Sequence, residues 1–319
     1  MSELTPNNAP FLQNPYPDDE IDLKELFSVL WSGKGLISAV TGLAAAISVV
    51  VALLLPNIYT ASALLAPAES SAGGLSSLMK QYGGLASLAG VSLPGDEEGS
   101  DAVLGMELMQ SRAFVGDFIE RRGILPALMA AKRWDSESRE LLLDPDIYDT
   151  QTGVWVRDVD PPKRPKPSLL EAHEVFVESL GVIEDDETGY VTVTFEHRSP
   201  EVAAQWVSWL VEDVNAAVKA QDVAEAKKSI EYLTQQVANT SLADLQAMFF
   251  ELIQSQTETV MLAEVRPEYV FKTIDPAVVP EEKSKPSRVL ICVLGTLLGG
   301  MMGVTIVLIR HSARSEPKA

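Results

Sequence analysis

The sequence is poor in the residues that build cross-links and metal centres. It contains one cysteine, Cys292, and three scattered histidines, at positions 173, 197 and 311. One cysteine forms no intramolecular disulfide framework, and isolated histidines do not supply the clustered ligands of a zinc site. We therefore expect no metal ion and no cofactor.

Positive charge is also scarce. Residues 57–287 carry 38 acidic and 19 basic residues, which is nearly all of the formal net charge of −20. A surface of this sign repels nucleic acid and anionic lipid headgroups. Among so many carboxylates, an acidic pair such as Asp185–Asp186 is expected by chance, and we interpret it as a solvated turn.

No residue combination indicates an enzyme. Trp134, Tyr148 and Trp155 lie near acidic residues and are of the type that stacks on sugar rings, but packing within the protein is the commoner role of such side chains. We expect no catalytic residues.

Two runs lack Asp, Glu, Lys, Arg and His altogether, namely residues 35–55 and 289–309. Each has 21 residues, which as a helix extends roughly 31 Å and matches the hydrocarbon core of a bilayer. The first run is too long for a signal peptide and follows an acidic leader of 34 residues. We predict two transmembrane helices.

The predicted spans divide the chain into five parts. Residues 1–34 form a leader, 35–55 the first span, 56–288 a large external domain, 289–309 the second span and 310–319 a tail. Lys34, Arg310, Arg314 and Lys318 flank the spans on the side of the termini, which predicts that both termini are cytoplasmic. The large domain then lies on the outer side of the membrane, and the protein is predicted to cross the membrane twice.

Small residues recur along one face of each span. Gly295, Gly299 and Gly303 are four residues apart, and the first span offers a comparable ridge at Ser38, Gly42 and Ala46. Small residues at this spacing let two membrane helices approach closely. We predict that these two ridges pack, within or between subunits. Transport is not expected, because ion handling requires ionisable groups at depth in the membrane.

An amphipathic helix precedes the first span. Its apolar residues have helical spacing and form one stripe: Leu23, Leu26, Phe27, Leu30 and Trp31. We expect this helix to lie in the inner interface of the membrane, with Trp31 at the level of the headgroups.

Glycine and proline are absent from Glu201 to Val265. Ser199 and Pro200 form a helix start signal, so the sequence predicts a long helix over about 200–264, roughly 95 Å if continuous. A break near Asn239–Ser241 is the alternative, because the apolar stripe is interrupted there.

The remaining external sequence predicts an α+β base. "NIYTASALLAP", "GVIED", "GYVTVTFEH" and the alternation at Tyr269, Phe271 and Ile274 indicate strands, and helical patterns occur at about 101–122, 126–143 and "SLLEAHEVFVESLG". A repeat, "GGLSSL" and "GGLASL", lies in a glycine-rich stretch over 72–100. A neck over 275–286 precedes the second span, and Pro276, Pro280 and Pro286 forbid helix there.

The chain resembles the polysaccharide co-polymerases of the Wzz chain-length-determinant type. The resemblance is carried by "EIDLKELFSVLW", "PNIYTASALLAP", "GGLASLAG", "SRAF", "YLTQQVANT", "RPEYVFKTIDPAVVP" and "LGTLLGGMMG". It implies a two-pass protein of a Gram-negative inner membrane, with a periplasmic α/β base near the membrane, a long projecting helical arm and a closed ring of identical subunits. It also implies that the protein is not an enzyme but sets the modal length of O-antigen or a related polysaccharide made by a Wzy polymerase, with the growing lipid-linked polymer as a further partner.

The resemblance assigns roles to particular residues, and it implies that the small-residue ridges of the two spans contact the polymerase. Pro276, Pro280, Pro286 and the three glycines at 295, 299 and 303 match the proline-rich neck and glycine-rich second span of the family. The branch of the family with a fused tyrosine kinase is not expected, because about ten residues follow the second span and no G-x-x-x-x-G-K-[ST] loop occurs. Two other classes remain open: a two-span periplasmic sensor and an adaptor subunit of an export complex.

Overall fold

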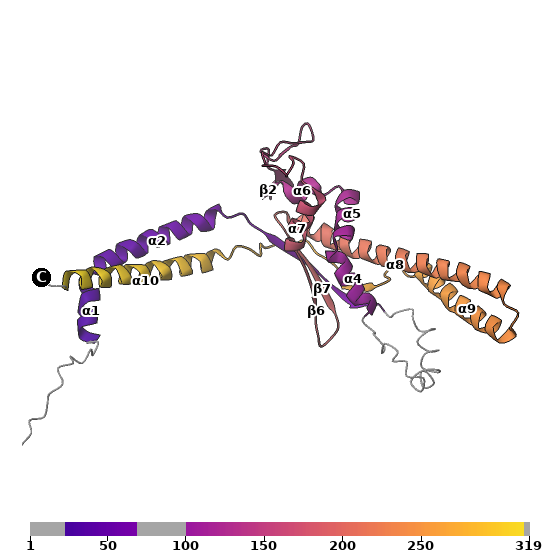
Figure 1. Ribbon diagram of the computed structural model, residues 1–319. Coiled ribbons are helices and arrows are strands. Elements are labelled where there is room, and N and C mark those ends of the chain that lie inside the picture. The colour runs from indigo at the N-terminus through magenta and orange to yellow at the C-terminus, as the bar shows by residue number, and fades with distance from the viewer. Residues whose placement is uncertain (1–22, 69–99, 316–319) are drawn as a thin grey trace, which may run out of the picture. The chain divides into compact units, whose positions relative to one another are not determined.

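The computed structural model describes residues 23–68 and 100–315 (Figure 1). The chain divides into two compact units, one made of residues 1–55 and 287–319 and the other of residues 56–286. The predicted glycine-rich repeat lies outside the described residues. The fold class is α+β, as predicted, with an apolar helix long enough to span a membrane at each end.

A four-stranded antiparallel sheet forms the base of the second unit. Its order is β6 (Leu180–Glu184), β7 (Val191–His197), β1 (Tyr59–Pro67) and β8 (Phe271–Asp275). Central strand β1 pairs with β7 along its length and with β8 over its second half. The sheet therefore joins three regions of the sequence that are separated by long intervening segments.

The sequence pattern explains the sheet well. In β7 every second residue is buried and the residues between are partly exposed, which is the alternation expected of a half-buried strand. The turn before β7 is held by the Asp185 carboxylate, which accepts hydrogen bonds from the backbone N–H groups of Glu187 and Thr188. All four predicted strands are confirmed, and Asp185 belongs to a turn.

Four shorter helices accompany the sheet: α4 (Ser100–Gln110), α5 (Arg112–Arg122), α6 (Leu125–Met129) and α7 (Leu169–Ser179). An aromatic cluster joins α5, α7 and the following long helix to the buried face of the sheet. Phe176 of α7 lies at its centre, with ring centroids 5.6 Å from Phe118, 5.0 Å from Phe195 and 6.4 Å from Trp206. Such aromatic packing supplies a large share of the apolar area that stabilises a domain of this size.

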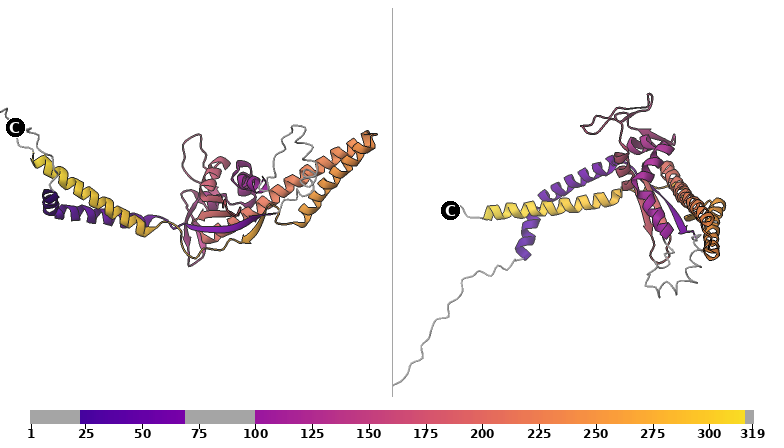
Figure 2. Two further views of the ribbon diagram at one scale, coloured as in Figure 1. Left: turned by 90° about the horizontal axis from the view of Figure 1, so that it is seen from below. Right: turned by 45° about the vertical axis from the view of Figure 1, so that its right-hand side comes forward.

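A two-helix arm extends from the base (Figures 1 and 2). Helix α8 (Pro200–Asn239) packs on the sheet with its first half, and α9 (Ala243–Val265) returns antiparallel along its second half. The continuous helix over 200–264 is thus replaced by a hairpin, and the break at 240–242 matches the alternative that the sequence left open.

The reversal has a local cause and a tertiary cause. Asn239, Thr240 and Ser241 carry short polar side chains that compete with helical backbone hydrogen bonds. The Gln246 amide then donates to the Thr240 carbonyl at 2.9 Å and satisfies an acceptor at the end of α8. Folding back lets the apolar stripes of the two helices cover each other within one chain.

The helix expected over 126–143 is wrong. Helix α6 ends at Met129, and the chain forms a hairpin of β2 (Ala131–Asp135) and β3 (Glu140–Leu143). Arg139 in the connecting turn has a φ of 54°. A left-handed residue there breaks the helical pattern that the apolar spacing suggested. A second hairpin follows, of β4 (Tyr148–Asp149) and β5 (Val154–Trp155).

Candidate functional site

The described residues of the first unit form three helices: α1 (Leu23–Ser32), α2 (Lys34–Leu54) and α10 (Arg288–Ser315). Helix α2 and residues 288–311 of α10 have mean hydropathies of 2.4 and 2.2. In the apolar stretch of each helix, 11% of the residues are buried inside the protein. The core helices of a soluble domain are mostly buried. Both helices are long and apolar enough to cross a membrane.

The glycines of α10 lie against α2. A Cβ atom added to Gly295 would lie 2.5 Å from Ser48 Cβ, and one added to Gly303 would lie 3.1 Å from Ile37 Cα. At Gly299 an added Cβ would overlap the Ala44 methyl group and lie 3.4 Å from Thr41 Cα. The missing side chains therefore permit a close approach of two backbones, as in small-residue contacts between membrane helices.

The structure brings a different face of α2 to these glycines than the sequence suggested. Ser38, Gly42 and Ala46 are exposed, and a Cβ on Gly42 would meet nothing within 4 Å. The contacting residues are instead Ile37, Thr41, Ala44 and Ser48. The predicted ridge on α2 is therefore wrong for this contact: a helix turns 100° per residue, so a shift of one position moves the ridge off the interface.

The predicted amphipathic helix forms as α1. Phe27 and Trp31 are 65% and 63% exposed and stack with ring centroids 5.9 Å apart, and the Lys34 ammonium lies 4.7 Å from the Trp31 ring centroid. Leu30 is partly exposed. Leu23 and Leu26 belong to α1, but the structure does not describe their side chains. An exposed aromatic pair beside a lysine suits an interface between lipid and water. The interfacial location of α1 remains a prediction.

The two ends of the second unit are tied together by hydrogen bonds. The Ile58 N–H donates to the Lys285 carbonyl at 3.0 Å, and the Ser284 N–H donates to the Ile58 carbonyl at 2.9 Å. Lys285 also pairs with Glu196 of β7 at 2.8 Å, and the Thr60 hydroxyl donates to Ser284 Oγ. The chain therefore enters and leaves this unit at one fixed point beside the sheet.

No helix occurs between β8 and α10, where Pro276, Pro280 and Pro286 lie. Pro276 is exposed, whereas Pro280 and Pro286 are partly exposed. Prolines restrict the backbone of this segment. Its role as a stiff neck remains a prediction.

A buried asparagine ties the arm to the sheet. Asn215 of α8 is 4% exposed, and its Oδ1 accepts hydrogen bonds from the N–H groups of Val270 at 2.7 Å and Phe271 at 2.9 Å. Its Nδ2 donates to the Phe271 carbonyl at 3.0 Å. The side chain thus satisfies three backbone groups where the chain returns from α9 into β8.

A charged cluster ties α5 to α8. Asp213 is 4% exposed and accepts hydrogen bonds from Arg122 at 2.7 Å and Arg121 at 3.2 Å, while the Arg122 guanidinium lies 4.8 Å from the Trp209 ring centroid. The hydrogen bond to Asp213 is the main cause that raises the pKa of Arg122. The two guanidinium partners compensate the buried carboxylate and so join α5 to α8, because an unpaired buried charge would be strongly destabilising.

His197 is buried beside the aromatic cluster. Its Nδ1 accepts a hydrogen bond from the Ser199 N–H at 3.0 Å, so the neutral ring carries its proton on Nε2, which donates to the Ala127 carbonyl at 3.0 Å. Burial is the main cause that lowers the His197 pKa below its usual 6.5, and Arg198 lowers it further. His197 thus holds the turn between β7 and α8 in its neutral form.

We expect the folding stability to fall as the pH drops below about 6.5, because the unfolded state then binds a proton that folded His197 does not. The free energy of unfolding should change by up to about 1.4 kcal/mol per pH unit from this group. Urea unfolding at several pH values measures the effect. The amide of His197→Gln offers one donor and one acceptor and does not titrate, so the decline should be smaller. His173→Gln retains His197 and should behave as the unmodified chain; an equal decline in His197→Gln would contradict the assignment.

Within residues 23–68 and 100–315, no group of three or more His, Cys, Asp or Glu side chains is placed to hold a metal ion. The buried polar side chains described above each have a structural partner.

Comparison with known protein families tests the resemblance that the sequence suggested. The family model for Wzz, chain length determinant protein, matches residues 19–121. A second model, GNVR, described as a G-rich domain on putative tyrosine kinase, matches residues 245–312. The resemblance to the Wzz chain-length determinants is confirmed.

The Wzz match covers α1, α2, β1, α4 and most of α5, and the GNVR match covers most of α9, β8, the segment with the three prolines and most of α10. Among solved structures, a full-length bacterial polysaccharide co-polymerase is similar, with a TM-score of 0.40 and 14% identity over 94% of this chain and 100% of that one. A fragment of WzzB, a polysaccharide co-polymerase from Salmonella Typhimurium, gives a TM-score of 0.32 and 11% identity over 72% and 100%. A search of curated proteins gave no match.

Sequence reasoning on this Wzz-like chain missed Asn215 and Asp213. Both lie in the first half of α8, whose neighbours Leu210, Val211, Val214 and Val218 are buried. Polar residues that interrupt an apolar helical stripe were the available signal, because a buried polar group requires a partner. The local sequence did not indicate which groups would be the partners of Asn215 and Asp213.

Proposed function

We propose that this protein is a non-catalytic polysaccharide co-polymerase that regulates the modal chain length of O-antigen or a related surface polysaccharide. The observation that carries the proposal is the Wzz match over residues 19–121, together with a second match that ends in the C-terminal apolar helix. The two matched regions include both helices long enough to cross a membrane. The protein is then a two-pass protein of the inner membrane with residues 56–288 in the periplasm.

In this proposal the chain acts as a scaffold and carries out no chemistry. Identical subunits pack through their bases and arms into a closed ring. Apolar side chains exposed on the arm support such packing, since isolated chains rarely expose so many: Tyr232, Leu242, Met248, Phe250, Met261 and Val265 are 46–79% exposed. A ring would also bring several pairs of spans together around a Wzy-type polymerase and the growing lipid-linked polymer.

The glycine contact and the neck have defined roles in the proposal. The pair of α2 and α10, held by Gly295, Gly299 and Gly303, is the element that engages the polymerase. The hydrogen bonds between Ile58 and Lys285 keep the two chain ends of the external domain together. The GNVR description mentions a tyrosine kinase, but this sequence contains no G-x-x-x-x-G-K-[ST] loop, which supports a role without phosphoryl transfer.

Deleting the gene tests the function directly. We expect the banding of the host's surface polysaccharide on a gel to lose its preferred length while total polymer stays nearly constant, because a scaffold that sets length does not form bonds itself. Reintroducing the gene should restore the preferred length. An unchanged band distribution would contradict chain-length control, and complete loss of polymer would indicate an essential synthetic role.

The mass of the purified protein in detergent tests the ring. We expect one large closed assembly, whereas a dimer would favour a sensor.

A further inference from the structure

A cavity of about 560 Å³ lies among α5, α6, the β4–β5 hairpin and the start of α7. This volume falls within the range typical of small-molecule sites. Its apolar lining includes Ile119, Leu125 and Leu169. Tyr148, Trp155, Glu120 and Lys166 also line it. An aromatic wall beside hydrogen-bonding groups is the lining that a sugar ring needs, because sugars have an apolar C–H face and a polar rim of hydroxyl groups.

The aromatic wall is rigidly built. Tyr148 and Trp155 are directly paired across the β4–β5 hairpin, and their ring centroids lie 4.9 Å apart at an interplanar angle of 60°. Asp149 holds the turn between them by accepting hydrogen bonds from the N–H of Gln151 at 2.9 Å and the hydroxyl of Thr152 at 2.6 Å. A fixed aromatic surface binds without the cost of ordering side chains.

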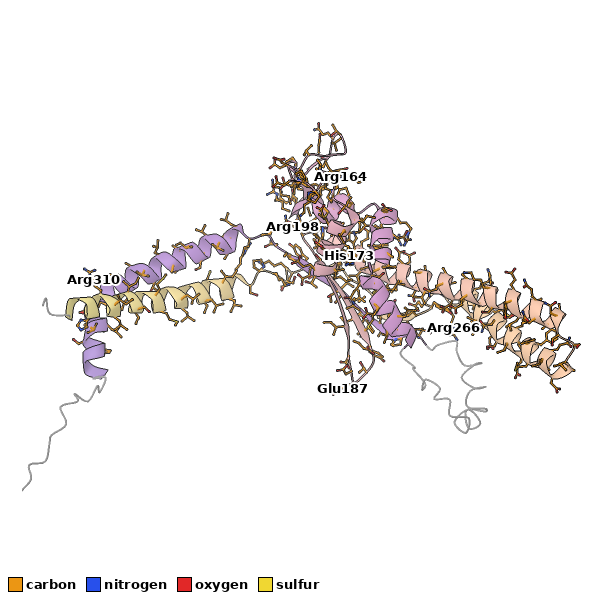
Figure 3. All side chains as sticks on the ribbon, viewed as in Figure 1. Arg164, His173, Glu187, Arg198, Arg266 and Arg310 are labelled. Carbon is orange, nitrogen blue, oxygen red and sulfur yellow. The ribbon has the colours of Figure 1, made fainter. Side chains whose placement is uncertain are left out.

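A basic segment borders the cavity. Residues 162–168, PKRPKPS, contain Lys163, Arg164 and Lys166 and no acidic residue, although the external domain as a whole is strongly acidic. These three residues line a second cavity of about 560 Å³, which also has Lys166 and Pro167 in common with the first. Figure 3 labels Arg164 in this region. A local concentration of positive charge in such a chain favours an anionic ligand.

The basic segment is also fixed in position. Arg157, just after β5, donates from Nε to the Pro165 carbonyl at 2.7 Å and from Nη2 to the Arg164 carbonyl at 2.9 Å. The same guanidinium pairs with Glu171 of α7 at 2.7 Å, and both side chains are less than 20% exposed. Arg157 thus links the segment to the helix and neutralises Glu171, one of the two carboxylates that line the second cavity.

We propose that the aromatic cavity and the adjoining basic segment form a binding site for an anionic saccharide, with a sugar ring on Tyr148 and Trp155 and its carboxylate or phosphate groups on Lys163, Arg164 and Lys166. This proposal rests on the proposed function, since a regulator of polymer length would bind the polymer directly. It makes the growing chain a ligand of the external domain at a defined place.

Binding of oligosaccharides to the full chain in detergent tests the site. The probes are hexasaccharides of hyaluronan, alginate and polysialic acid, with neutral maltohexaose for comparison, each titrated to millimolar concentration in a calorimeter. We expect at least one acidic probe to bind, with an affinity that falls as salt is added because the basic groups are exposed. No binding of any acidic probe, or equal binding of maltohexaose, would overturn the proposal.

Variants locate the binding. Trp155→Ala removes the aromatic wall and should weaken binding about tenfold, which is about 1.4 kcal/mol. The double variant Lys163→Gln/Lys166→Gln changes two exposed side chains that no fold contact requires, and should weaken binding and remove most of its salt dependence.

Two controls match these changes. Trp134→Ala alters a tryptophan in the neighbouring β2–β3 hairpin, and Lys227→Gln/Lys228→Gln makes the same change of charge on exposed positions of α8. Both should bind as the unmodified chain does. Full affinity in Trp155→Ala or in Lys163→Gln/Lys166→Gln would refute this location. The measurement does not use chain length, so its failure is distinct from an unchanged polysaccharide ladder after gene deletion.

Discussion

Replacing Gly299 by alanine should loosen the pair of α2 and α10 by about 1–3 kcal/mol, the usual cost of forcing one extra carbon into a close contact. The added methyl group would overlap the Ala44 side chain and lie 3.4 Å from Thr41 Cα, so one helix must move. The intrinsic helix preference of alanine over glycine opposes this loss by roughly 0.5–1 kcal/mol. The steric cost is the larger effect.

The single cysteine of the chain provides the measurement. Cys292 lies in α10 and is partly buried, so its labelling by a membrane-permeant maleimide should be faster when the helix pair opens more often. A loss of about 1.4 kcal/mol corresponds to a tenfold larger open population. The same variant should broaden the length distribution of the polysaccharide if the helix pair engages the polymerase.

The adjacent glycine is a matched control. A Cβ on Gly300 would lie 3.7 Å from the Thr41 hydroxyl, an ordinary contact, so Gly300→Ala should label at the original rate. Ala44→Gly removes the methyl group that Gly299→Ala meets, and the double variant should recover most of the lost stability. Equal labelling of Gly299→Ala and Gly300→Ala would show that this contact does not hold the helices together.

Replacing Asn215 by alanine should destabilise the external unit by on the order of 3 kcal/mol or more. The substitution leaves two N–H groups and one carbonyl without their partner in a buried position, and each unsatisfied group costs about 1–3 kcal/mol. Urea unfolding followed by tryptophan fluorescence should show a lower midpoint. Hydrogen exchange should be faster at the amides of Val270 and Phe271.

Asn239→Ala makes the same chemical change at an exposed position at the end of α8 and should leave the midpoint nearly unchanged. Exchange at Val270 and Phe271 separates a local loss from a general one, since their amides are the two groups that Asn215 Oδ1 satisfies. Unaltered exchange and an unaltered midpoint in Asn215→Ala would show that water replaces the asparagine without cost.

Particular elements show where sequence reasoning succeeds. Strand β7 was predictable because alternate burial leaves a period of two in the sequence, and the start of α8 was predictable because the Ser199 side chain accepts a hydrogen bond from the Val202 N–H. The helix expected across 126–143 failed because a left-handed residue, Arg139, reverses the chain inside an apolar pattern that is also compatible with helix.

The candidate sites also contain parts that the sequence predicted and parts that it did not. The glycine ridge of α10 was visible in the sequence, because its spacing of four is a property of one helix. The residues of α2 that meet it were not, because the contacting face depends on how two helices rotate against each other. Tyr148 and Trp155 were recognisable in the sequence as a type that stacks on sugar rings, although packing was the favoured interpretation. The cavity that they line was not predictable, since its lining comes from four separate elements.

The sequence by itself determined two membrane-length helices, an acidic body between them and an α+β base, because hydropathy, charge and strand alternation are local properties of consecutive residues. Only the tertiary structure decided that α9 folds back along α8, that Asn215 holds the returning strand, and that a basic segment borders an aromatic cavity. These features arise from contacts between residues far apart in the chain, and their free energy exists only once the whole unit has folded.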